Sequence, residues 1–203
     1  MCFHAQQTQS QTAVHQRYGT QGPVSTGIYN GFSHPQMTVI TAKEPKETTL
    51  YHWGLIPHWA KDKDIRRYTL NAKVETMAEK PSFRSAKRCL IVTDGFYEWQ
   101  WQDTKGKKKQ KYLITHPKEE LFTFAGLHDE WIDRTSGEIV NSFAIVTTAA
   151  QGIMQEIHNS KLRMPLTLSP GTEASWLAGE IPAPFFDFTG KESSLAGGSR
   201  STT

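Results

Sequence analysis

The sequence predicts one α+β domain that is built on a mostly antiparallel β-sheet, partly closed into a barrel, with a few short helices. Three observations support this prediction. Short segments rich in β-branched and aromatic residues recur along most of the chain, turn-forming segments separate some of them, and helical patterns are few. A length of 203 residues allows one ample core, and a hydrophobic fraction of 37% fits a globular protein.

Six segments have the composition and the partial alternation that are typical of strands. They are residues 37–42, 49–54, 88–101, 111–116, 121–127 and 139–148. Gln102–Gln110 carries Gly106 among lysines between two of these segments, so it is predicted to be a hairpin tip with solvated lysines. Thr135–Gly137 predicts a second turn.

Helical signals occur at three places. Gln9–Tyr18 is predicted to be a short helix, and Ala149–His158 places several apolar residues on one helical face. Ser169 followed by Pro170 resembles an N-cap and a first-turn proline, which predicts a helix that continues through Trp176.

The chain shows no repeat and no internal linker, so residues 1–188 are expected to form one domain. Residues 189–203 are rich in glycine, serine and threonine and are predicted to be a disordered tail. No apolar run approaches the ~20 residues that a membrane-spanning helix needs. The first residues lack the pattern of a signal peptide, so we expect the protein in the cytoplasm, associated with the nucleoid and with no membrane contact. We also expect it to be a monomer.

Charge and cysteine content narrow the possible chemistry. The net charge of +3 does not identify a nucleic-acid-binding protein, and the basic residues near Lys61–Arg67 fit a solvated surface as well as a phosphate-binding one. Of the two cysteines, Cys89 lies in an apolar run and is predicted to be buried. Without paired CxxC spacing, a phosphate-binding loop or an HExxH motif, no metal and no cofactor are expected.

Cys2 stands in a distinctive position. If Met1 is removed, the chain begins with an amine and a thiol on one residue, with pKa values near ~8 and ~8.5. Such an aminothiol condenses with an aldehyde to form a five-membered thiazolidine, which an internal cysteine cannot do. Considered alone, an incidental or structural cysteine is the better explanation of Cys2, because a Met-Cys start also arises by chance.

Two titratable residues are candidates for acid–base chemistry. Glu98 lies in the aromatic motif GFYEW, where burial raises a carboxyl pKa and favours a proton donor. An outward-facing glutamate on an aromatic strand is the alternative. His158 ends a predicted helix and can carry protons at neutral pH, or can simply complement the helix dipole.

Further polar and aromatic residues also have two interpretations. Asn30 and Asn71 lie in turn-like segments and either orient a ligand or form turns. Trp53 is predicted to be a core residue, whereas Trp59 precedes a charged segment and is expected to be exposed, where it can stack on a base. Arg163 either holds a phosphate or pairs with a carboxylate.

Six motifs follow one another along the chain: Met1-Cys2, YNGFSHP, WGLIPHW, LNAKVET, RCLIVTDGFYEW and IHNSKLRMPL. With this set, residues 1–188 resemble the SOS-response-associated peptidase (SRAP) family of abasic-site processing proteins. The resemblance implies the fold of that family and binding of single-stranded DNA that contains an abasic site. It also implies a thiazolidine crosslink that shields the lesion, with weak lyase activity at abasic sites, reversal of the crosslink and autopeptidase activity.

The resemblance also implies a role for each candidate residue. Cys2 corresponds to the nucleophile, Glu98 to the acid–base group that opens the sugar and resolves the adduct, His158 to the proton shuttle, and Asn71 to the residue that positions the lesion. By the same resemblance Asn30 and Thr147 would line the site. Three basic residues would contact phosphates: Lys73, Arg84 and Arg163.

The chain departs from the family pattern near the nucleophile. The family usually begins Cys-Gly-Arg-Phe, whereas Phe3 and His4 follow Cys2 here, so the arginine that would hold a phosphate is absent. Lys73 stands where an arginine is common, and the segment between His158 and Arg163 is longer than in many members. These changes affect DNA affinity and site geometry more than the chemistry.

Two other functions fit parts of the same pattern. A thiol peptidase or hydrolase would use Cys2, His158 and Glu98 on peptides or amides. A non-catalytic module that binds single strands would use stacking and phosphate contacts, without any role for the Cys2 thiol.

Overall fold

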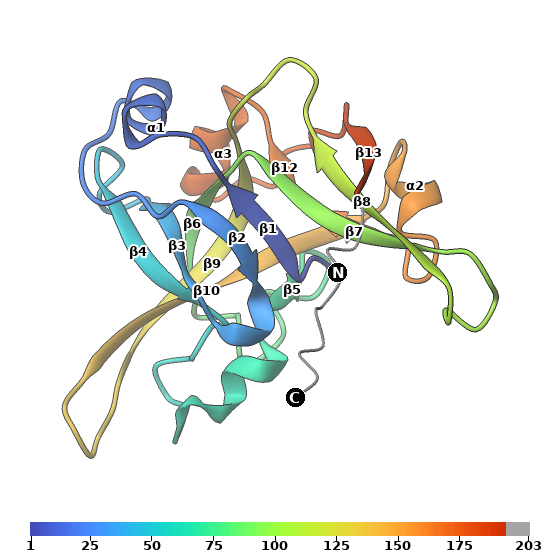
Figure 1. Ribbon diagram of the computed structural model, residues 1–203. Helices are drawn as coiled ribbons and strands as arrows, with labels where there is room; N and C mark the ends of the chain where they lie inside the picture. The colour runs from blue at the N-terminus through green and yellow to red at the C-terminus, as the bar shows by residue number, and fades with distance from the viewer. Residues whose placement is uncertain (194–203) are drawn as a thin grey trace, which may run out of the picture.

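The computed structural model describes residues 1–193, which form two β-sheets with short helices at their edges (Figure 1). The smaller sheet has five strands. In spatial order they are β13 (Thr189–Ser193), β8 (Lys109–Thr115), β7 (Gly95–Trp101), β1 (His4–Gln7) and β2 (Gly27–Asn30). All neighbouring pairs in this sheet are antiparallel.

The larger sheet closes into a five-stranded barrel, which confirms the predicted fold class. Around the ring the strands are β3 (Gln36–Thr41), β4 (Thr48–Trp53), β10 (Ile139–Ala149), β9 (Phe122–Ile132) and β6 (Lys87–Thr93). Four junctions are antiparallel, and a short parallel contact between β4 and β10 closes the ring. Three short strands extend it: β5 (Asn71–Lys73), β11 (Arg163–Pro165) and β12 (Thr167–Leu168).

The prediction of one continuous strand over 88–101 is wrong, because the chain changes sheets at Asp94. The Asp94 carboxylate accepts hydrogen bonds from the backbone and the hydroxyl of Thr8, and the Asp94 backbone donates to Gln6 at 3.1 Å. Thr93 also donates its hydroxyl to the Gln6 carbonyl, at 2.7 Å. The residues around β1 therefore fix the bend that directs β7 along β1.

Both faces of β6 are buried from Cys89 to Thr93, which explains why the run CLIV lacks alternation. On one face of β6, Cys89 and Ile91 pack in a cluster that includes Cys2 and Phe96. The opposite face packs against the helices in a second cluster, formed among others by Leu90, Val92, Val14 and Trp176. Cys2 is thus part of the core, and both cysteines are free thiols.

The helices differ in extent from the sequence prediction. α1 (Gln11–Tyr18) forms as expected, with the Ser10 hydroxyl accepting from the Ala13 backbone at 3.2 Å. The helix predicted over Ala149–His158 is reduced to the single turn α2 (Met154–Ile157), because β10 continues to Ala149 and turns occupy the next residues.

The third helix begins later than predicted. α3 (Thr172–Ala178) has Gly171 at its N-cap with a φ of 94°, so Ser169 and Pro170 precede the helix. The backbone of Thr172 donates to the Ser169 carbonyl at 3.0 Å, which forms a turn before the helix instead of a side-chain cap. Two 3₁₀ helices complete the described elements, η1 (Gly31–Ser33) and η2 (Lys63–Tyr68).

The C-terminal prediction is wrong for Thr189–Ser193, since these residues form β13 and pair with β8. Strand pairing with a hydrogen-bonding edge stabilised a segment whose composition alone indicated disorder. The remainder of the predicted tail, 194–203, lies outside the described residues. The two turn predictions are confirmed: residues 102–108 connect β7 to β8, and Thr135–Gly137 lies between β9 and β10. Among residues 1–193, no helix is long and apolar enough to span a membrane.

Trp53 at the end of β4 links the barrel to the segments that approach the N-terminus. Its side chain is fully buried, and its Nε1–H donates to the Leu70 carbonyl at 2.9 Å, directly before Asn71. Gly31 lies so close that a Cβ atom there would come within 3.1 Å of the indole. Trp53 therefore holds the starts of both β5 and η1.

Replacing Trp53 by Phe is expected to lower the free energy of unfolding by about 1–3 kcal/mol, because the buried Leu70 carbonyl loses its donor. Chemical denaturation measures the change. The matched control is Trp59→Phe, which alters a side chain in a residue that is 46% exposed and should stay within about 0.5 kcal/mol of the parent. Equal effects of the two substitutions would contradict the linking role of Trp53.

Candidate active site

Cys2 lies at the entrance to β1, where three segments distant in sequence meet. β1 pairs with β2 on one side and with β7 on the other, with His4 opposite Asn30 and Tyr97. The Cys2 side chain is fully buried, and its thiol lies 3.5 Å from the His4 carbonyl oxygen. Burial raises the pKa of this thiol well above its ordinary value, so the sulfur is held as a neutral thiol.

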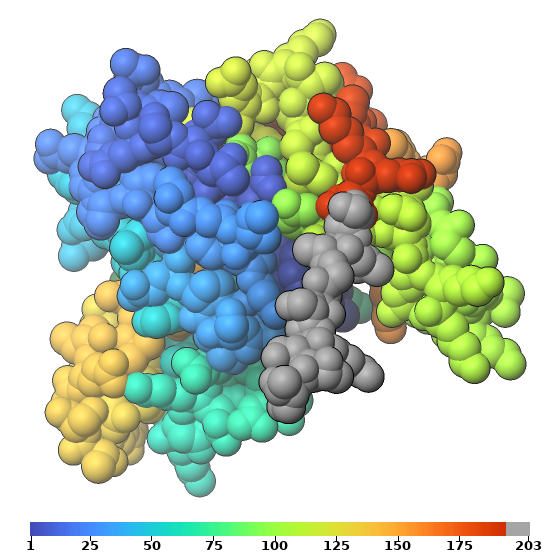
Figure 2. All heavy atoms as spheres, viewed as in Figure 1, coloured from blue at the N-terminus to red at the C-terminus, as the bar shows by residue number. Residues whose placement is uncertain are grey.

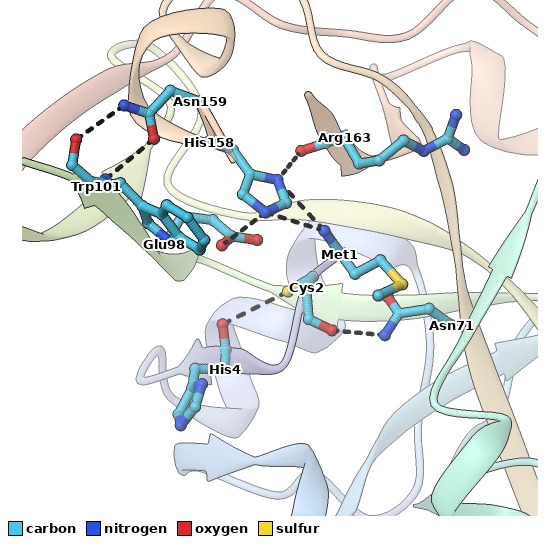
Figure 3. Close-up of polar contacts among 9 residues, drawn as sticks. All are labelled: Met1, Cys2, His4, Asn71, Glu98, Trp101, His158, Asn159 and Arg163. Carbon is cyan, nitrogen blue, oxygen red and sulfur yellow. Dashed lines mark hydrogen bonds and ion pairs between the residues drawn. The ribbon is translucent and has the colours of Figure 1, made fainter. Parts of the chain in front are cut away.

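Asn71 fixes the backbone of Cys2. It begins β5, which runs parallel to β10, and its Nδ2 donates to the Cys2 carbonyl at 2.9 Å (Figure 3). Its Oδ1 is buried and has no hydrogen-bond partner among residues 1–193. Asn71 therefore orients the N-terminal residues and keeps one acceptor available for a bound group.

Glu98 lies on β7 beside the N-terminus and is 5% exposed. Burial raises the pKa of its carboxyl to about 8, although the nearby Met1 amine and the Trp99 backbone N–H favour the charged form. Glu98 Oε1 is also buried without a partner among the described residues. Glu98 is thus a carboxylic acid that keeps its proton at neutral pH and has a free oxygen.

His158 follows α2 and is 6% exposed. Its Nδ1 bonds to the carbonyl oxygen of Arg163, an acceptor, so this nitrogen carries the proton and Nε2 presents its lone pair. Nε2 lies 3.9 Å from Glu98 Oε2. Burial, and then the Met1 amine, lower the pKa of His158 to about 4.

The distance between Glu98 and His158 permits an ion pair, yet the two pKa shifts both favour the neutral forms. Between pH values of about 4 and 8, a protonated carboxyl therefore faces an imidazole lone pair. Such a pair moves a proton without creating a net charge in a buried site. We call Glu98 and His158 the acid–base pair.

The first residue lies directly over the acid–base pair. The Met1 amine is 3.3 Å from His158 Nδ1 and 3.4 Å from Nε2, and burial lowers its pKa. Its side chain extends toward Asn71 (Figure 3). A cleft of about 240 Å³ opens here and is lined in part by Met1, Phe3, Glu98 and His158.

Arg163 and Thr147 lie behind His158, where the structure gives the arginine a partner. The Arg163 guanidinium binds both oxygens of Glu75, at 2.6 and 2.9 Å, and donates to the Thr147 carbonyl at 2.6 Å. The Arg163 hydrogen bond lowers the pKa of Glu75. Thr147 is fully buried and its hydroxyl bonds to the Ala72 carbonyl at 3.3 Å, so the prediction that Thr147 lines the site has no support here.

Four predicted DNA contacts lie outside this constellation. Asn30 caps η1, because its side-chain oxygen accepts from the Phe32 backbone N–H at 3.1 Å. This is the turn-forming role that the sequence analysis gave as one of two alternatives. Trp59 is 46% exposed, as predicted, and Lys73 and Arg84 are also exposed. No contact among residues 1–193 ties Trp59, Lys73 or Arg84 to Cys2, so their binding roles stay predictions.

The sequence analysis named Phe3 and His4 beside the nucleophile but missed the aromatic residues that hold them. Phe3 stacks on Phe32 with ring centroids 4.8 Å apart, and His4 packs edge-on against Trp99 at 4.7 Å. Burial, and then Lys111, lower the pKa of His4, so it does not replace the cationic arginine of the family pattern. The signal was Phe3 itself, because a large aromatic side chain directly after Cys2 needs an apolar partner close to the site.

Comparison with known proteins agrees with this architecture. Residues 1–185 match the family described as SOS response associated peptidase (SRAP). Over 144 residues the chain is 39% identical to "Abasic site processing protein YoqW" of Bacillus subtilis, a match that covers 70% of this chain and 62% of that protein. It is 35% identical over 157 residues to "Abasic site processing protein HMCES" of Xenopus tropicalis, covering 64% and 45%.

Two crystal structures show the same fold. A protein from Bacteroides thetaiotaomicron matches with a TM-score of 0.80 at 35% identity, covering 87% of this chain and 81% of that one. A protein from Bordetella bronchiseptica matches with a TM-score of 0.80 at 21% identity, covering 96% and 100%, which is a likeness of fold. Since the family pattern extends over residues 1–185, the chain belongs to the SOS response associated peptidase (SRAP) family.

Proposed function

We propose that this protein binds single-stranded DNA at an abasic site and forms a thiazolidine crosslink through Cys2 after Met1 is removed. The observation that carries the proposal is the convergence of the N-terminal residues with the acid–base pair and Asn71. The relatives named as abasic site processing proteins support the substrate class. The crosslink shields the lesion from cleavage and bypass.

The chemistry needs only the two nucleophiles of Cys2 and a proton donor. The Cys2 amine adds to the C1′ aldehyde of the ring-opened sugar, and the resulting carbinolamine loses its hydroxyl as water. The thiol sulfur then adds to the imine carbon, and the thiol proton ends on the nitrogen. The sum is aldehyde plus aminothiol giving thiazolidine plus one water, with no oxidant or reductant.

The acid–base pair supplies the proton transfers. Protonated Glu98 donates to the sugar ring oxygen as the ring opens and to the hydroxyl that departs as water. The neutral His158 lone pair then accepts a proton and returns it during reversal. Since burial keeps the Cys2 thiol neutral, the amine attacks first and the sulfur follows onto the more reactive imine.

Asn71 holds the Cys2 backbone, and its free Oδ1 accepts from a hydroxyl of the lesion. The same groups support weak lyase activity, in which a base removes a proton from C2′ of the imine and the 3′ phosphate leaves. Closure of the thiazolidine competes with this elimination and keeps it slow. The autopeptidase activity implied by the family is assigned to the same pair, which flanks Met1.

The surrounding contacts extend the proposal to the bound strand. Lys73 lies on β5 and Asn30 precedes η1, while Arg84 is an exposed cation between β5 and β6. Trp59 offers an exposed indole for stacking. Arg163 reaches a phosphate by exchanging it for Glu75. We expect a monomer that acts in the cytoplasm or nucleoid, without a metal or a cofactor.

A thiol peptidase acting on other proteins fits the site less well. That chemistry needs a thiolate and an imidazolium side by side, as in cysteine proteases. Burial raises the pKa of Cys2 and lowers that of His158, which opposes both charges. The aldehyde reaction tolerates a neutral thiol because the amine begins it.

Cys2→Ala is expected to abolish the stable thiazolidine adduct with an abasic oligonucleotide, because the sulfur that closes the ring onto the imine carbon is lost. Intact mass spectrometry should show the parent protein lacking Met1 and gaining the oligonucleotide less one water. Both Cys2→Ala and Cys2→Ser keep the α-amine, so borohydride should still trap an imine in either variant although the stable adduct is lost.

The control for this pair is Cys89→Ala, which removes the other buried thiol and should crosslink like the parent. If Cys2→Ala crosslinks as well as the parent, the proposed function is wrong. Salt-sensitive binding by Cys2→Ala with no preference for the lesion, and no adduct in the parent, would indicate a binding module instead.

Glu98→Gln is expected to slow crosslinking by about 10²-fold, since the amide cannot donate the proton that a general acid supplies. In the parent, the rate should fall as the pH rises through about 8, where Glu98 loses its proton. This alkaline limb should be absent in Glu98→Gln. Rates from gel-resolved crosslinks between pH 6 and 10 test both expectations.

Glu98→Gln should slow the reaction but raise the free energy of unfolding relative to the parent at alkaline pH. Because the pKa of Glu98 is raised from 4.5 to about 8 in the folded protein, its contribution is lost as the pH rises through this range. As the pH rises from 5 to 9, the free energy of unfolding of Glu98→Gln should therefore increase by about 1–3 kcal/mol relative to that of the parent. Denaturant unfolding at both pH values measures this, and a pH-independent difference would contradict the buried, protonated carboxyl.

A further inference from the structure

A second hollow adjoins the cleft over the acid–base pair. It has a volume of about 500 Å³ and shares Trp101 and Ser160 with the cleft. We call it the hairpin groove, and it is lined by Trp101, Gln102, Asp103, Thr104, Asn159 and Ser160. One wall is the β7–β8 hairpin, which projects from the body of the molecule (Figure 2). The other is the segment between His158 and Arg163.

We propose that the hairpin groove, together with the adjoining part of the cleft that Lys109 and Lys161 line, binds the single-stranded nucleotides that flank the abasic site, with these two lysines contacting phosphates and Trp101 stacking on a base. The inference rests on the proposed function, because it extends the path of the same DNA strand. The groove and the cleft share Trp101 and Ser160, so the groove is an adjoining path for a strand whose lesion lies beside Glu98 and His158.

Asn159 fixes the two walls to each other. Its Oδ1 accepts from the Trp101 backbone N–H and its Nδ2 donates to the Trp101 carbonyl, both at 3.0 Å (Figure 3). Gln100 adds a bond from its Nε2 to the Glu156 carbonyl at 3.2 Å. Because Asn159 follows His158 directly, these bonds align the groove with the acid–base pair and form it before DNA arrives.

Charge on the groove favours a polyanion. The hairpin carries five lysines, at positions 105, 107, 108, 109 and 111, and Lys161 lies on the facing segment. Asp103 is the acidic residue of the tip, and its carboxylate accepts from the backbones of Lys105, Lys107 and Lys108. Those bonds lower the pKa of Asp103 and hold its carboxylate against the backbone of the turn, and the five hairpin lysines together with Lys161 outnumber this one negative charge beside the groove.

Aromatic surface beside these lysines favours unpaired bases over other anions. Trp99 and Trp101 both line the cleft and are half-buried. Lys109 lies 5.6 Å from the centroid of the Trp101 ring, and Gly106 packs so closely on that ring that a Cβ atom would come within 2.6 Å. A fixed indole next to mobile cations binds bases by stacking and phosphates by charge, without sequence preference.

The test measures binding to unreactive DNA, so it does not depend on the Cys2 chemistry. The probes are fluorescein-labelled oligonucleotides with one tetrahydrofuran abasic analogue: a 5-mer and a 15-mer with central lesions, and two 15-mers with the lesion near either end. Anisotropy titrations at several salt concentrations compare the parent with the double variant Lys109→Glu/Lys161→Glu. The matched control is Lys43→Glu/Lys46→Glu, with the same charge change in the β3–β4 turn, across the molecule from the hairpin (Figure 1).

The groove variant should bind the central 15-mer at least tenfold more weakly than the control variant does, with a much smaller loss for the 5-mer. Its slope of log K against log salt should fall by about 1.4, the value for two phosphate contacts on a single strand. Of the two 15-mers with a lesion near one end, only the one whose flank enters the groove should bind the groove variant more weakly. Trp101→Ala should weaken the same strand without changing the salt slope.

Equal losses for the 5-mer and the 15-mer, or a loss matched by the control variant, overturn the inference. It is also overturned if poly-glutamate competes as well as the 15-mer, since the surface would then recognise charge alone. A separate measurement tests the proposed function. If the protein forms no covalent adduct with a natural abasic site while its binding to the 15-mer still depends on Lys109 and Lys161, the proposed function fails and the groove inference stands.

Discussion

The insertion of β1 between β2 and β7 is the constraint on which the site depends. This short strand has only four residues, yet its pairing with β7 brings Cys2 beside Glu98, ninety-six positions away in sequence. The bend at Asp94 secures the arrangement, because its carboxylate accepts from Thr8 just beyond β1. These hydrogen bonds fix the register of β1 against β7. A slip of one residue would move every side chain of β1 to the opposite face of the sheet.

The buried electrostatics follow from that packing. Removing Glu98 and His158 from water favours their neutral forms, so the site stores one transferable proton instead of an ion pair. Unpaired oxygens on Glu98 and Asn71 add a cost in folding free energy that the surrounding core must offset. This pattern is typical of positions where a protein accepts lower stability to be ready for a ligand.

Much of the fold could be predicted because strand composition and turn residues act locally. Residues 37–42 and 139–148 became β3 and β10 with shifts of about one residue, and the lysine-rich segment became a hairpin tip. Local signals failed where distant partners decide the outcome: β13 forms only because β8 offers an edge, and the strand over 88–101 breaks only because Thr8 binds Asp94. Glu98, His158, Asn71 and Cys2 were identified from motifs, whereas Asn159 and Glu75 act through contacts that no spacing along the chain reveals.

In the structure without DNA, the Arg163 guanidinium is already paired with the Glu75 carboxylate. A guanidinium held by two carboxylate oxygens has the bidentate geometry that a phosphate also offers. Under the proposed function, a phosphate that binds Arg163 replaces Glu75, so one anion is exchanged for another and the guanidinium stays paired. Because the Glu75 contacts are lost in that exchange, the net gain in affinity from such a phosphate contact is small.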